Sequence, residues 1–381
     1  MNILVVCNYD LYQNLTYSFV HSQIREYVNL GHRVRVIIPA AMGKKARNGK
    51  RIDKPVLISQ ADGVEMYDMR YISLGKYGRK YFNPNSLYTT AKLLQKYLLK
   101  DFQPDVIHAH TFGPDSQLGV VLKKKLGVPL VVTTHGSDTT LLVNRGELDK
   151  LYHYCEHVDV IVPVSKALED RLRQCKTESK IQMIHNGFNG EGIALNMDKT
   201  PCSCLQVSNL IELKQIPVTI RAFEKIYRKY PQARLTIIGK GPDRQMLEEL
   251  CEQLQITDVV TFTGQLQHHD VMEHMAKTQF YIMPSVREGF PISYLEAMGM
   301  GCVIVGTATE GIAEIVDHEV NGILVQPGDH DAIADHVCAC IENPQKTIAI
   351  AEAGNQTAGM MTWNHNAQKL VALFEDLIAK Q

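Results

Sequence analysis

Two carboxylates, Glu288 and Glu296, lie on a segment whose residue types suit a phosphorylated sugar. Glu296 falls within an otherwise apolar stretch, Ile292–Met300, that predicts a helix. A carboxylate buried in such a helix needs hydrogen-bond donors, and the vicinal hydroxyls of a ribose supply two. The dipeptide Gly289-Phe290 offers backbone N–H groups to a phosphate, Pro291 favours the helix start, and Glu288 precedes both where it can meet a sugar. The alternative is a helix whose Glu296 simply pairs with a cation.

Histidine and aspartate clusters are the other candidates for chemistry, and their spacing does not favour a metal site. His108 and His110 alternate at the end of a predicted strand, and His268-His269 adjoin Asp270. A zinc site needs a further convergent ligand, which neither spacing supplies. The string Asp329-His330-Asp331 follows a Pro-Gly turn at a predicted helix start, where capping accounts for it. We therefore expect no metal and no other cofactor.

Short apolar runs alternate with amphipathic stretches, and these elements must position the candidate residues. Continuous apolar strands separated by helices of about 10–15 residues indicate parallel sheets covered on both faces. The predicted strands are Ile3–Cys7, Val34–Pro39, Val106–Ala109, Leu130–Thr134, Val160–Val164, Ile181–Ile184, Leu205–Val207, Leu235–Ile238, Val259–Phe262, Phe280–Met283, Val303–Val305 and Ile323–Val325. The predicted helices include Phe19–Leu30, Thr219–Tyr230, Gln245–Leu254, His330–Ile341 and Trp363–Ile378.

The series of strands restarts after Asn186–Pro201, a segment with the glycine and proline content of a linker. We therefore expect an α/β protein of two doubly wound, Rossmann-like domains, at 1–190 and 200–360, that face a central cleft. Residues 361–381 form a final helix, with the hypothesis that it packs back on the first domain. Ligands of open α/β sheets bind outside the carboxyl ends of the strands, so the site should lie on those loops.

Glycine spacing argues against a classical NAD enzyme. The first strand-to-helix turn, Cys7–Asn14, contains no glycine, although a dinucleotide pyrophosphate requires close approach of the backbone there. The nearest match is Gly239-Lys240-Gly241-Pro242, which lacks the third glycine. It is either a tight turn or a loop that touches a nucleotide, with Pro242 at the first position of the next helix.

The charge of the chain is divided unequally. The formal net charge of −1 excludes a strongly basic nucleic-acid binder, so we expect no nucleic-acid partner. Residues 1–200 hold 27 Lys and Arg against 19 Asp and Glu, whereas residues 201–381 hold 13 against 22. The stretch Lys44–Lys100 has 13 basic and 4 acidic residues, interleaved with tyrosine and phenylalanine. This composition suits an anionic membrane surface or a polyanionic acceptor; the alternative is a solvated loop and an ordinary helix face.

Cysteine content and hydropathy bear on the compartment. The nine cysteines include no Cys-x-x-Cys pair, which favours buried thiols in a reducing compartment. The N-terminal apolar run is too short for a signal peptide, and no window approaches 18 consecutive apolar residues. We expect a cytoplasmic protein, with the hypothesis that it is peripheral on the inner face of the plasma membrane.

Several motifs together carry a family resemblance. The segment from Pro284-Ser285 through Glu288 and Glu296 resembles retaining glycosyltransferases of family 4, which have the GT-B fold. The other corresponding segments, in family order, are Gly31–Val34, Asp105–His110, Thr134–Asp138, Val164–Lys166, Ile184–Asn189, Val207–Lys214, Ile237–Pro242, Phe262–Gly264 and Asn321–Asp329.

The resemblance assigns roles residue by residue. Lys214 corresponds to the lysine that neutralises the donor diphosphate, Glu296 to the ribose-binding glutamate, and Glu288 to the glutamate that contacts the donor sugar. His135 corresponds to the histidine that reaches the donor sugar from the first domain. With Glu288, His135 and Lys214 as the catalytic set, the donor-binding set implied is Glu296, Gly289, Phe290, Pro291, Ile292, Asn209, Gly264 and Asp138.

The sequence also departs from the family pattern. Asn209 stands where the family usually has an arginine, so the implied phosphate clamp has one side-chain charge fewer. The glycine-rich acceptor loop is replaced by a segment with Tyr9, Tyr12 and Asn14, which we take as acceptor-binding candidates. The usual Gly-Gly-Ile turn reads Glu310-Gly311-Ile312.

The resemblance implies a metal-independent, retaining hexosyltransferase. Its substrates would be a UDP- or GDP-linked sugar and a glycan or lipid-linked glycan acceptor, in capsule, teichuronic-acid or exopolysaccharide synthesis. Two alternatives remain open. One is a nucleotide-sugar epimerase or hydrolase on the same fold, and the other is a non-catalytic glycan- or lipid-binding module.

Overall fold

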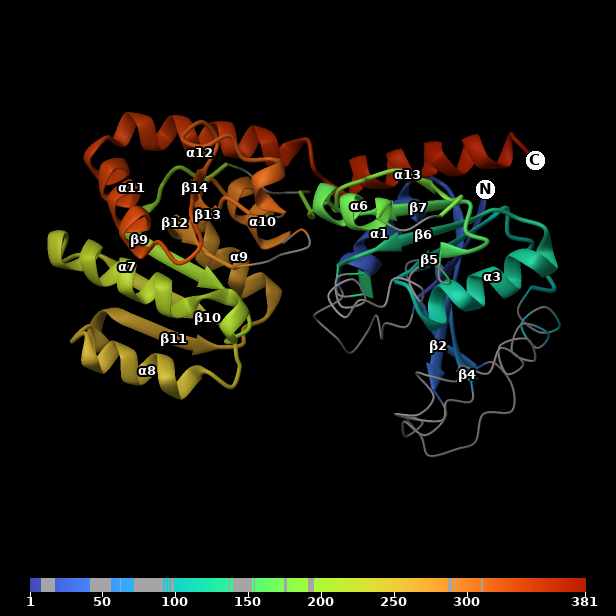
Figure 1. Ribbon diagram of the computed structural model, residues 1–381, viewed down its shortest axis with the longest axis horizontal. Coiled ribbons are helices and arrows are strands. Elements are labelled where there is room, and N and C mark those ends of the chain that lie inside the picture. The colour runs from blue at the N-terminus through green and yellow to red at the C-terminus, as the bar shows by residue number, and fades with distance from the viewer. Residues whose placement is uncertain are drawn as a thin grey trace. The chain divides into compact units, whose positions relative to one another are not determined.

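The computed structural model divides the chain into two compact units (Figure 1). The first unit is Met1–His185 with Trp363–Gln381, and the second is Asn186–Thr362. The residues that the structure describes are 1–7, 18–41, 56–61, 63–71, 92, 94, 96, 99–136, 138–139, 153, 155–174, 177–190, 195–286, 290, 292–309 and 311–381. Within these ranges, no helix has the length and apolar character needed to cross a membrane.

The first unit is built on an eight-stranded sheet in the order β3-β4-β2-β1-β5-β6-β7-β8. All neighbouring strands are parallel except β3 and β4. The strands are β1 (Asn2–Val6), β2 (Arg33–Ala41), β3 (Val56–Ala61), β4 (Val64–Tyr71), β5 (Val106–His110), β6 (Leu130–Thr134), β7 (Val160–Pro163) and β8 (Lys180–Ile181).

The hairpin of β3 and β4 is the part of this sheet that the sequence did not predict. In β4, the buried Val64 and Met66 alternate with the partly exposed Glu65 and Tyr67, and Met69 is buried in the other core layer. Polar and apolar residues are therefore mixed along this strand, and it contains no continuous apolar run of the kind that identifies a central parallel strand. The expectation of purely parallel sheets is therefore wrong at this edge of the first unit.

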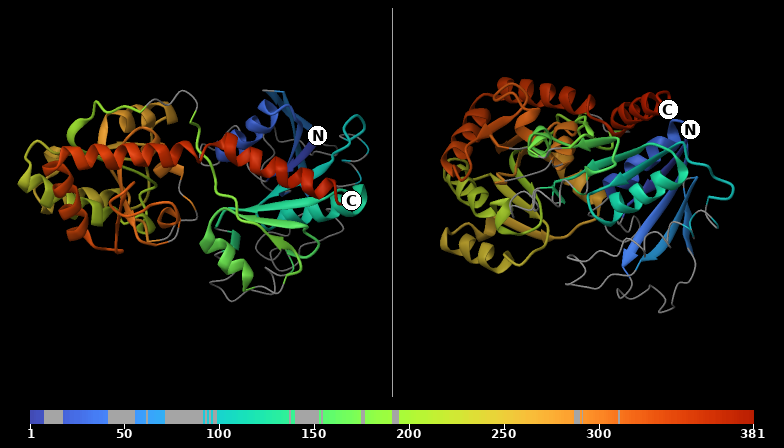
Figure 2. Two further views of the ribbon diagram at one scale, coloured as in Figure 1. Left: turned by 90° about the horizontal axis from the view of Figure 1, so that it is seen from above. Right: turned by 45° about the vertical axis from the view of Figure 1, so that its right-hand side comes forward.

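Helices cover both faces of the first sheet. The helix α3 (Pro114–Leu126) contributes to one core layer, and α1 (Ser18–Asn29) packs with α13 (Trp363–Ile378) in the other. The rings of Tyr27 and Phe374 lie 5.9 Å apart in this second layer. The last helix of the chain, red in Figures 1 and 2, therefore completes the first unit rather than the second.

Polar bonds fix the position of α13. The buried Asn366 accepts a hydrogen bond from Gln23 Nε2 at 2.6 Å and donates one to the His185 carbonyl at 2.7 Å. Asn364 donates to Glu26 at 3.0 Å. These bonds tie the helix to α1 and to the last residue of the N-terminal part of the unit.

The second unit is a six-stranded parallel sheet in the order β11-β10-β9-β12-β13-β14. Its strands are β9 (Thr200–Val207), β10 (Arg234–Ile238), β11 (Val260–Gly264), β12 (Thr278–Ile282), β13 (Val303–Thr307) and β14 (Ile323–Val325). Its helices are α7 (Ile216–Lys229), α8 (Arg244–Gln253), α9 (His268–Lys277), α10 (Ile292–Gly299), α11 (His330–Glu342) and α12 (Pro344–Gly359). Each predicted strand of this half is present.

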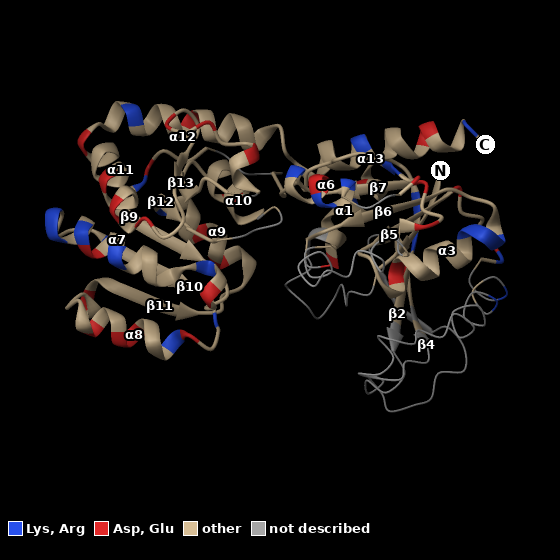
Figure 3. Cartoon of the chain, in the orientation of Figure 1, with Lys and Arg blue, Asp and Glu red and all other residues tan. Residues whose placement is uncertain are grey.

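Charged side chains of the second unit lie on its helix surfaces, with both signs interspersed (Figure 3). On α7, Lys225 pairs with Asp331 of α11, and Lys229 pairs with Glu342. Asp329 caps α11 through a bond from the Ala332 N–H at 2.9 Å, as the sequence predicted. The acidic excess of this half is thus spread over exposed helices.

Candidate active site

Three loops meet at the carboxyl edge of the second sheet. The Ser208 N–H donates to the Ile238 carbonyl at 3.0 Å, and the Gly239 N–H donates to the Gly264 carbonyl at 2.9 Å. The Leu210 N–H donates to the Lys240 carbonyl at 3.0 Å. The ends of β9, β10 and β11 are therefore joined directly by backbone hydrogen bonds.

Two glycines allow this close approach. A Cβ on Gly239 would lie 1.8 Å from the Ser208 carbonyl oxygen, and one on Gly241 would lie 2.1 Å from that of Leu210. The turn after β10 is therefore packed against the loop after β9, which accounts for its glycines without a nucleotide. The helix α8 begins at Arg244, so the prediction that Pro242 starts it is wrong: the turn continues through Pro242 to close on Leu210.

Lys214 ends a short 3₁₀ turn, Glu212–Lys214, on the loop after β9. The buried Gln206 on β9 donates its Nε2–H to the Lys214 carbonyl at 3.1 Å. The Val286 N–H donates to the Leu213 carbonyl at 3.1 Å. Lys214 is thus placed beside the segment that leads, two residues later, to Glu288. The exposed Asn209 lies on the same loop.

The loop after β12 is held by side chains from α10 and β13. Tyr294 donates a hydrogen bond to the Met283 carbonyl, and Thr307 Oγ1 donates to the Ser285 carbonyl at 2.6 Å. A Cβ on Gly306 would lie 2.7 Å from the Tyr294 hydroxyl, so a glycine in β13 leaves room for this anchor. These contacts fix the start of the loop on which the backbone N–H groups of Gly289 and Phe290 are predicted to bind a phosphate.

Part of the predicted site lies outside the described residues. Phe290 is buried and Ile292 is the first residue of α10. The undescribed candidates are Glu288, Gly289 and Pro291 in the second half, and Tyr9, Tyr12 and Asn14 in the first.

Glu296 lies inside α10, as predicted, and has an ionisable neighbour. Its side chain is 17% exposed, and its Oε1 lies 3.6 Å from Nε2 of His268, the first residue of α9. Burial raises the pKa of the Glu296 carboxyl above its usual value, and the charge of His268 partly offsets this rise. In the alternative interpretation, in which Glu296 simply pairs with a cation, His268 is the partner. Sequence reasoning considered His268 only as a metal ligand.

The first unit brings together two histidines at neighbouring strand ends. His110 ends β5, and His135 follows β6; Nδ1 of His110 lies 3.1 Å from Nε2 of His135, with the rings 12° from parallel. Burial lowers the pKa of His135 to about 3 and that of His110 well below its usual value. Both rings are therefore neutral at physiological pH, and one donates to the other.

Sequence reasoning did not include His110 among the site residues. The signal was available in the alternation of His108 and His110 on β5, because the ends of adjacent parallel strands meet at one edge of a sheet. His108 has a different environment: it lies between the Tyr27 hydroxyl at 3.1 Å and Thr133 Oγ1 at 2.8 Å. It is a buried histidine with both ring nitrogens bonded.

Asp138 connects the two loops that follow β5 and β6. Its carboxylate accepts hydrogen bonds from the backbone N–H groups of Phe112 and Gly136, each at 3.0 Å, and of His135 at 3.3 Å. Burial raises the pKa of Asp138, and these hydrogen bonds act in the opposite direction. The described contacts of this carboxylate thus shape the loop that carries His135.

Comparison with known proteins identifies the family. Residues 18–191 match the model described as glycosyltransferase family 4, and residues 194–357 match that of group 1 glycosyl transferases. The chain belongs to the family 4 type of glycosyltransferases. Both halves of the resemblance are therefore confirmed, and the two models adjoin where the two units divide.

Relatives and solved structures agree with this identification. An N-acetyl-alpha-D-glucosaminyl L-malate synthase of Bacillus anthracis is 26% identical over 288 residues, covering 72% of this chain and 74% of that protein. The putative colanic acid biosynthesis glycosyltransferase WcaL of Escherichia coli is 29% identical over 259 residues, 62% of each. A sucrose-phosphate synthase structure from Thermosynechococcus elongatus aligns with a TM-score of 0.79 at 18% identity, covering all of both chains. The expected GT-B fold is confirmed.

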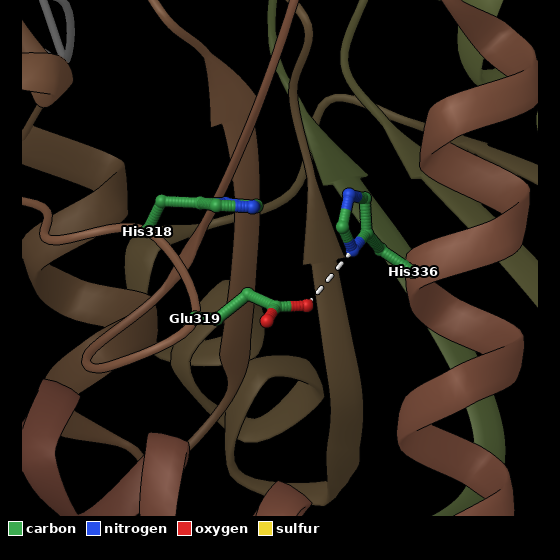
Figure 4. Close-up of side chains that lie close together, drawn as sticks. All are labelled: His318, Glu319 and His336. Atoms are coloured by element: carbon green, nitrogen blue, oxygen red, sulfur yellow. Dashed lines mark ion pairs between the residues drawn. The ribbon is translucent and has the colours of Figure 1, made fainter.

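The described part of this glycosyltransferase contains one cluster with metal-like spacing, formed by His318, Glu319 and His336 (Figure 4). Its ligand atoms lie within 4.8 Å of one another. Glu319 bonds His336 Nδ1 at 3.2 Å and Lys346 Nζ at 3.0 Å, so both carboxylate oxygens have partners. His318 Nδ1 accepts a hydrogen bond from the Leu324 N–H at 3.1 Å. In the neutral form of this ring, the proton is therefore on Nε2. The cluster is better explained as an ion-pair network than as a zinc site.

Proposed function

We propose that this glycosyltransferase moves a hexose from a UDP- or GDP-linked donor to a glycan or lipid-linked glycan in cell-surface polysaccharide synthesis. The main support for a nucleotide-sugar donor is the backbone hydrogen bond between Val286 and Leu213. It joins the turn that contains Lys214 to the segment before Glu288. The name of WcaL, with its reference to colanic acid biosynthesis, supports the acceptor half. A further structural neighbour, Anabaena HepE, was solved with UDP-glucose at a TM-score of 0.73 and 18% identity.

The proposed chemistry depends on charge placed at the leaving group. Sugar transfer resembles glycoside cleavage in its oxocarbenium-like transition state, and negative charge grows on the departing diphosphate. In this scheme Lys214 and the backbone N–H groups at the start of α10 stabilise that charge, and no metal is required. Asn209 supplies no charge, so Arg287 or Lys240 compensates.

The remaining roles belong to the same proposal. Glu288 lies beneath the sugar in a retaining reaction, and Glu296 accepts hydrogen bonds from the ribose. His135 completes the proposed catalytic set with Glu288 and Lys214. The other donor-binding positions proposed are Asp138, Asn209, Gly264, Gly289, Phe290, Pro291 and Ile292. The acceptor-binding positions proposed are Tyr9, Tyr12 and Asn14.

Binding to an anionic membrane surface through Lys44–Lys100 stays a prediction, as does the cytoplasmic location. Most of this stretch lies outside the described residues. Within it, Lys92, Lys96 and Lys100 are exposed at a spacing of four residues. Co-sedimentation with anionic liposomes over a range of salt concentrations tests the proposal, and indifference to lipid charge contradicts it.

The donor site is tested by thermal unfolding with UDP-, GDP- and ADP-linked sugars. A ligand that binds only the folded protein raises the free energy of unfolding by about 2.7 kcal/mol when its concentration is about 100 times its dissociation constant. We expect one nucleotide class to raise the melting temperature and the variant Glu296→Gln to weaken that response. If none of the three classes shifts the transition, the donor-site assignment is wrong.

Product analysis separates transfer from the two alternatives. Incubation with the stabilising donor alone should leave the sugar unchanged, whereas an epimerase or hydrolase would convert it without an acceptor. With an acceptor present, NMR should show that the product keeps the anomeric configuration of the donor sugar. The rate of transfer should be the same with and without a metal chelator. An inverted product would contradict the retaining mechanism.

A further inference from the structure

His268 connects two parts of the proposed donor site that are far apart in sequence. It is the first residue of α9 and follows β11, the strand that ends at Gly264. Its Nε2 lies 3.6 Å from Oε1 of Glu296, which belongs to α10 after β12. The segment proposed to border the base is thus in contact with the residue proposed to hold the ribose.

The environment of Glu296 explains why such a neighbour matters. Its sequence neighbours Leu295 and Ala297 are completely buried, and its own side chain is only 17% exposed. Burial favours the protonated acid, which can accept fewer hydrogen bonds than the carboxylate. A positive charge at 3.6 Å favours the carboxylate.

Two helices, α9 and α12, pack against α10 and carry further charged or titratable residues. These are His269, Asp270, Glu273, His274 and Lys277 on α9, and Lys346 and Glu352 on α12. Among the described residues, the ion pair of Glu296 is with His268 alone. His269 instead faces Asp270 and Glu273, at 3.5 and 3.8 Å, and its side chain is 80% exposed.

We propose that His268 is a positioning residue for donor binding, because its ring lies against the Glu296 carboxylate and orients it toward the ribose hydroxyls. This inference rests on the proposed function. The separation of 3.6 Å is that of an ion pair and is longer than a hydrogen bond, so the carboxylate oxygens keep their capacity to accept from a ligand. The 59% exposure of His268 allows its replacement without opening the core.

The test compares His268→Gln, His268→Lys and the matched control His269→Gln. We measure donor KM and kcat, and the dissociation constant of the bare nucleoside diphosphate by calorimetry, at pH 8, 7 and 6. Removing the charge should raise KM about two- to fivefold, the range of an exposed pair, with kcat nearly unchanged. The loss should grow as the pH falls, because Glu296 becomes protonated at a higher pH in His268→Gln.

The two control variants isolate the effect of charge. His268→Lys keeps a positive charge at each pH and should restore binding, whereas His269→Gln should behave as the wild type. A loss in His268→Gln that is equal at all three pH values, or is not rescued by lysine, overturns the proposal in favour of a purely structural role.

Failure of this inference differs from failure of the proposed function. If UDP or GDP binds the wild type and Glu296→Gln weakens that binding, the donor site stands. Wild-type affinity in His268→Gln would then overturn the positioning role alone. If UDP, GDP and ADP all fail to bind the wild type, both proposals are overturned.

Discussion

At the scale of single residues, the buried histidines of the first unit act as neutral hydrogen-bonding groups. His110 and His135 share one hydrogen bond, and His110 Nε2 has no partner among the described residues. Because each neutral ring carries one proton, the tautomer of His110 determines which nitrogen of His135 is protonated. We therefore expect His110 to position His135, the proposed contact to the donor sugar.

Replacing His110 should therefore affect both stability and turnover. In His110→Phe, the buried Nε2 of His135 loses this partner, at a cost of about 1–3 kcal/mol in the free energy of unfolding. We expect kcat to fall about tenfold. This corresponds to an increase of roughly 1.4 kcal/mol in the activation free energy when His135 is no longer held in place by this hydrogen bond. Nucleotide affinity serves as the control, because it depends on the second unit. A variant with wild-type kcat would contradict the positioning role.

At the scale of elements, the donor-side loops are positioned by glycines that permit contact between backbones. Gly239 has a φ of +145°, and its missing Cβ makes room for the Ser208 carbonyl. The same contact places the loop of Asn209 and Lys214. The glycines of this turn therefore shape the proposed phosphate site indirectly.

A pair of glycine substitutions tests this interpretation. Gly239→Ala should lower the free energy of unfolding by about 2–4 kcal/mol, because backbone strain adds to a clash with a carbonyl that must move. Gly328→Ala is the matched control, with a φ of +81° and no atom within 4 Å of its added Cβ. It should cost about 1 kcal/mol and leave donor affinity unchanged. Equal losses in urea unfolding would contradict the role given to the Ser208 contact.

At the scale of the whole molecule, the chain order and the units do not coincide, because α13 belongs to the first unit. The single tryptophan of the chain, Trp363, is buried at the start of α13 and serves as a fluorescent reporter for the unfolding of this helix. The same unit holds three histidines whose pKa values are lowered by desolvation, to about 3 for His108 and His135 and well below the usual value for His110.

These histidines predict that the first unit loses stability in mild acid. In the unfolded chain a histidine binds a proton below about pH 6.5, whereas in the folded unit it stays neutral down to its lowered pKa. The unfolded state then binds more protons, so each group lowers the free energy of unfolding by about 1.4 kcal/mol per pH unit below 6.5. Urea unfolding followed by Trp363 fluorescence at pH 7, 6 and 5 should detect this decline. A midpoint independent of pH would contradict it.

Local pattern in the sequence predicted the class of fold correctly, and it singled out the residues of the candidate site. Apolar runs between amphipathic helices predicted each strand of the second sheet, and the carboxyl ends of those strands are where Lys214 and the α10 loop lie. Glu296 stood out as a carboxylate within an apolar helix. Strand β4, in which polar and apolar residues are mixed, contains no continuous apolar run and was not predicted.

The pairings between distant segments depend on how the strands and helices are arranged in three dimensions. The tertiary structure joined His268 to Glu296, His110 to His135, and α13 to the first unit. Such contacts depend on strand order and helix crossings, which bring residues together across long stretches of chain. Local residue patterns describe what each segment buries, but the partner that it meets is set by how the sheets are assembled.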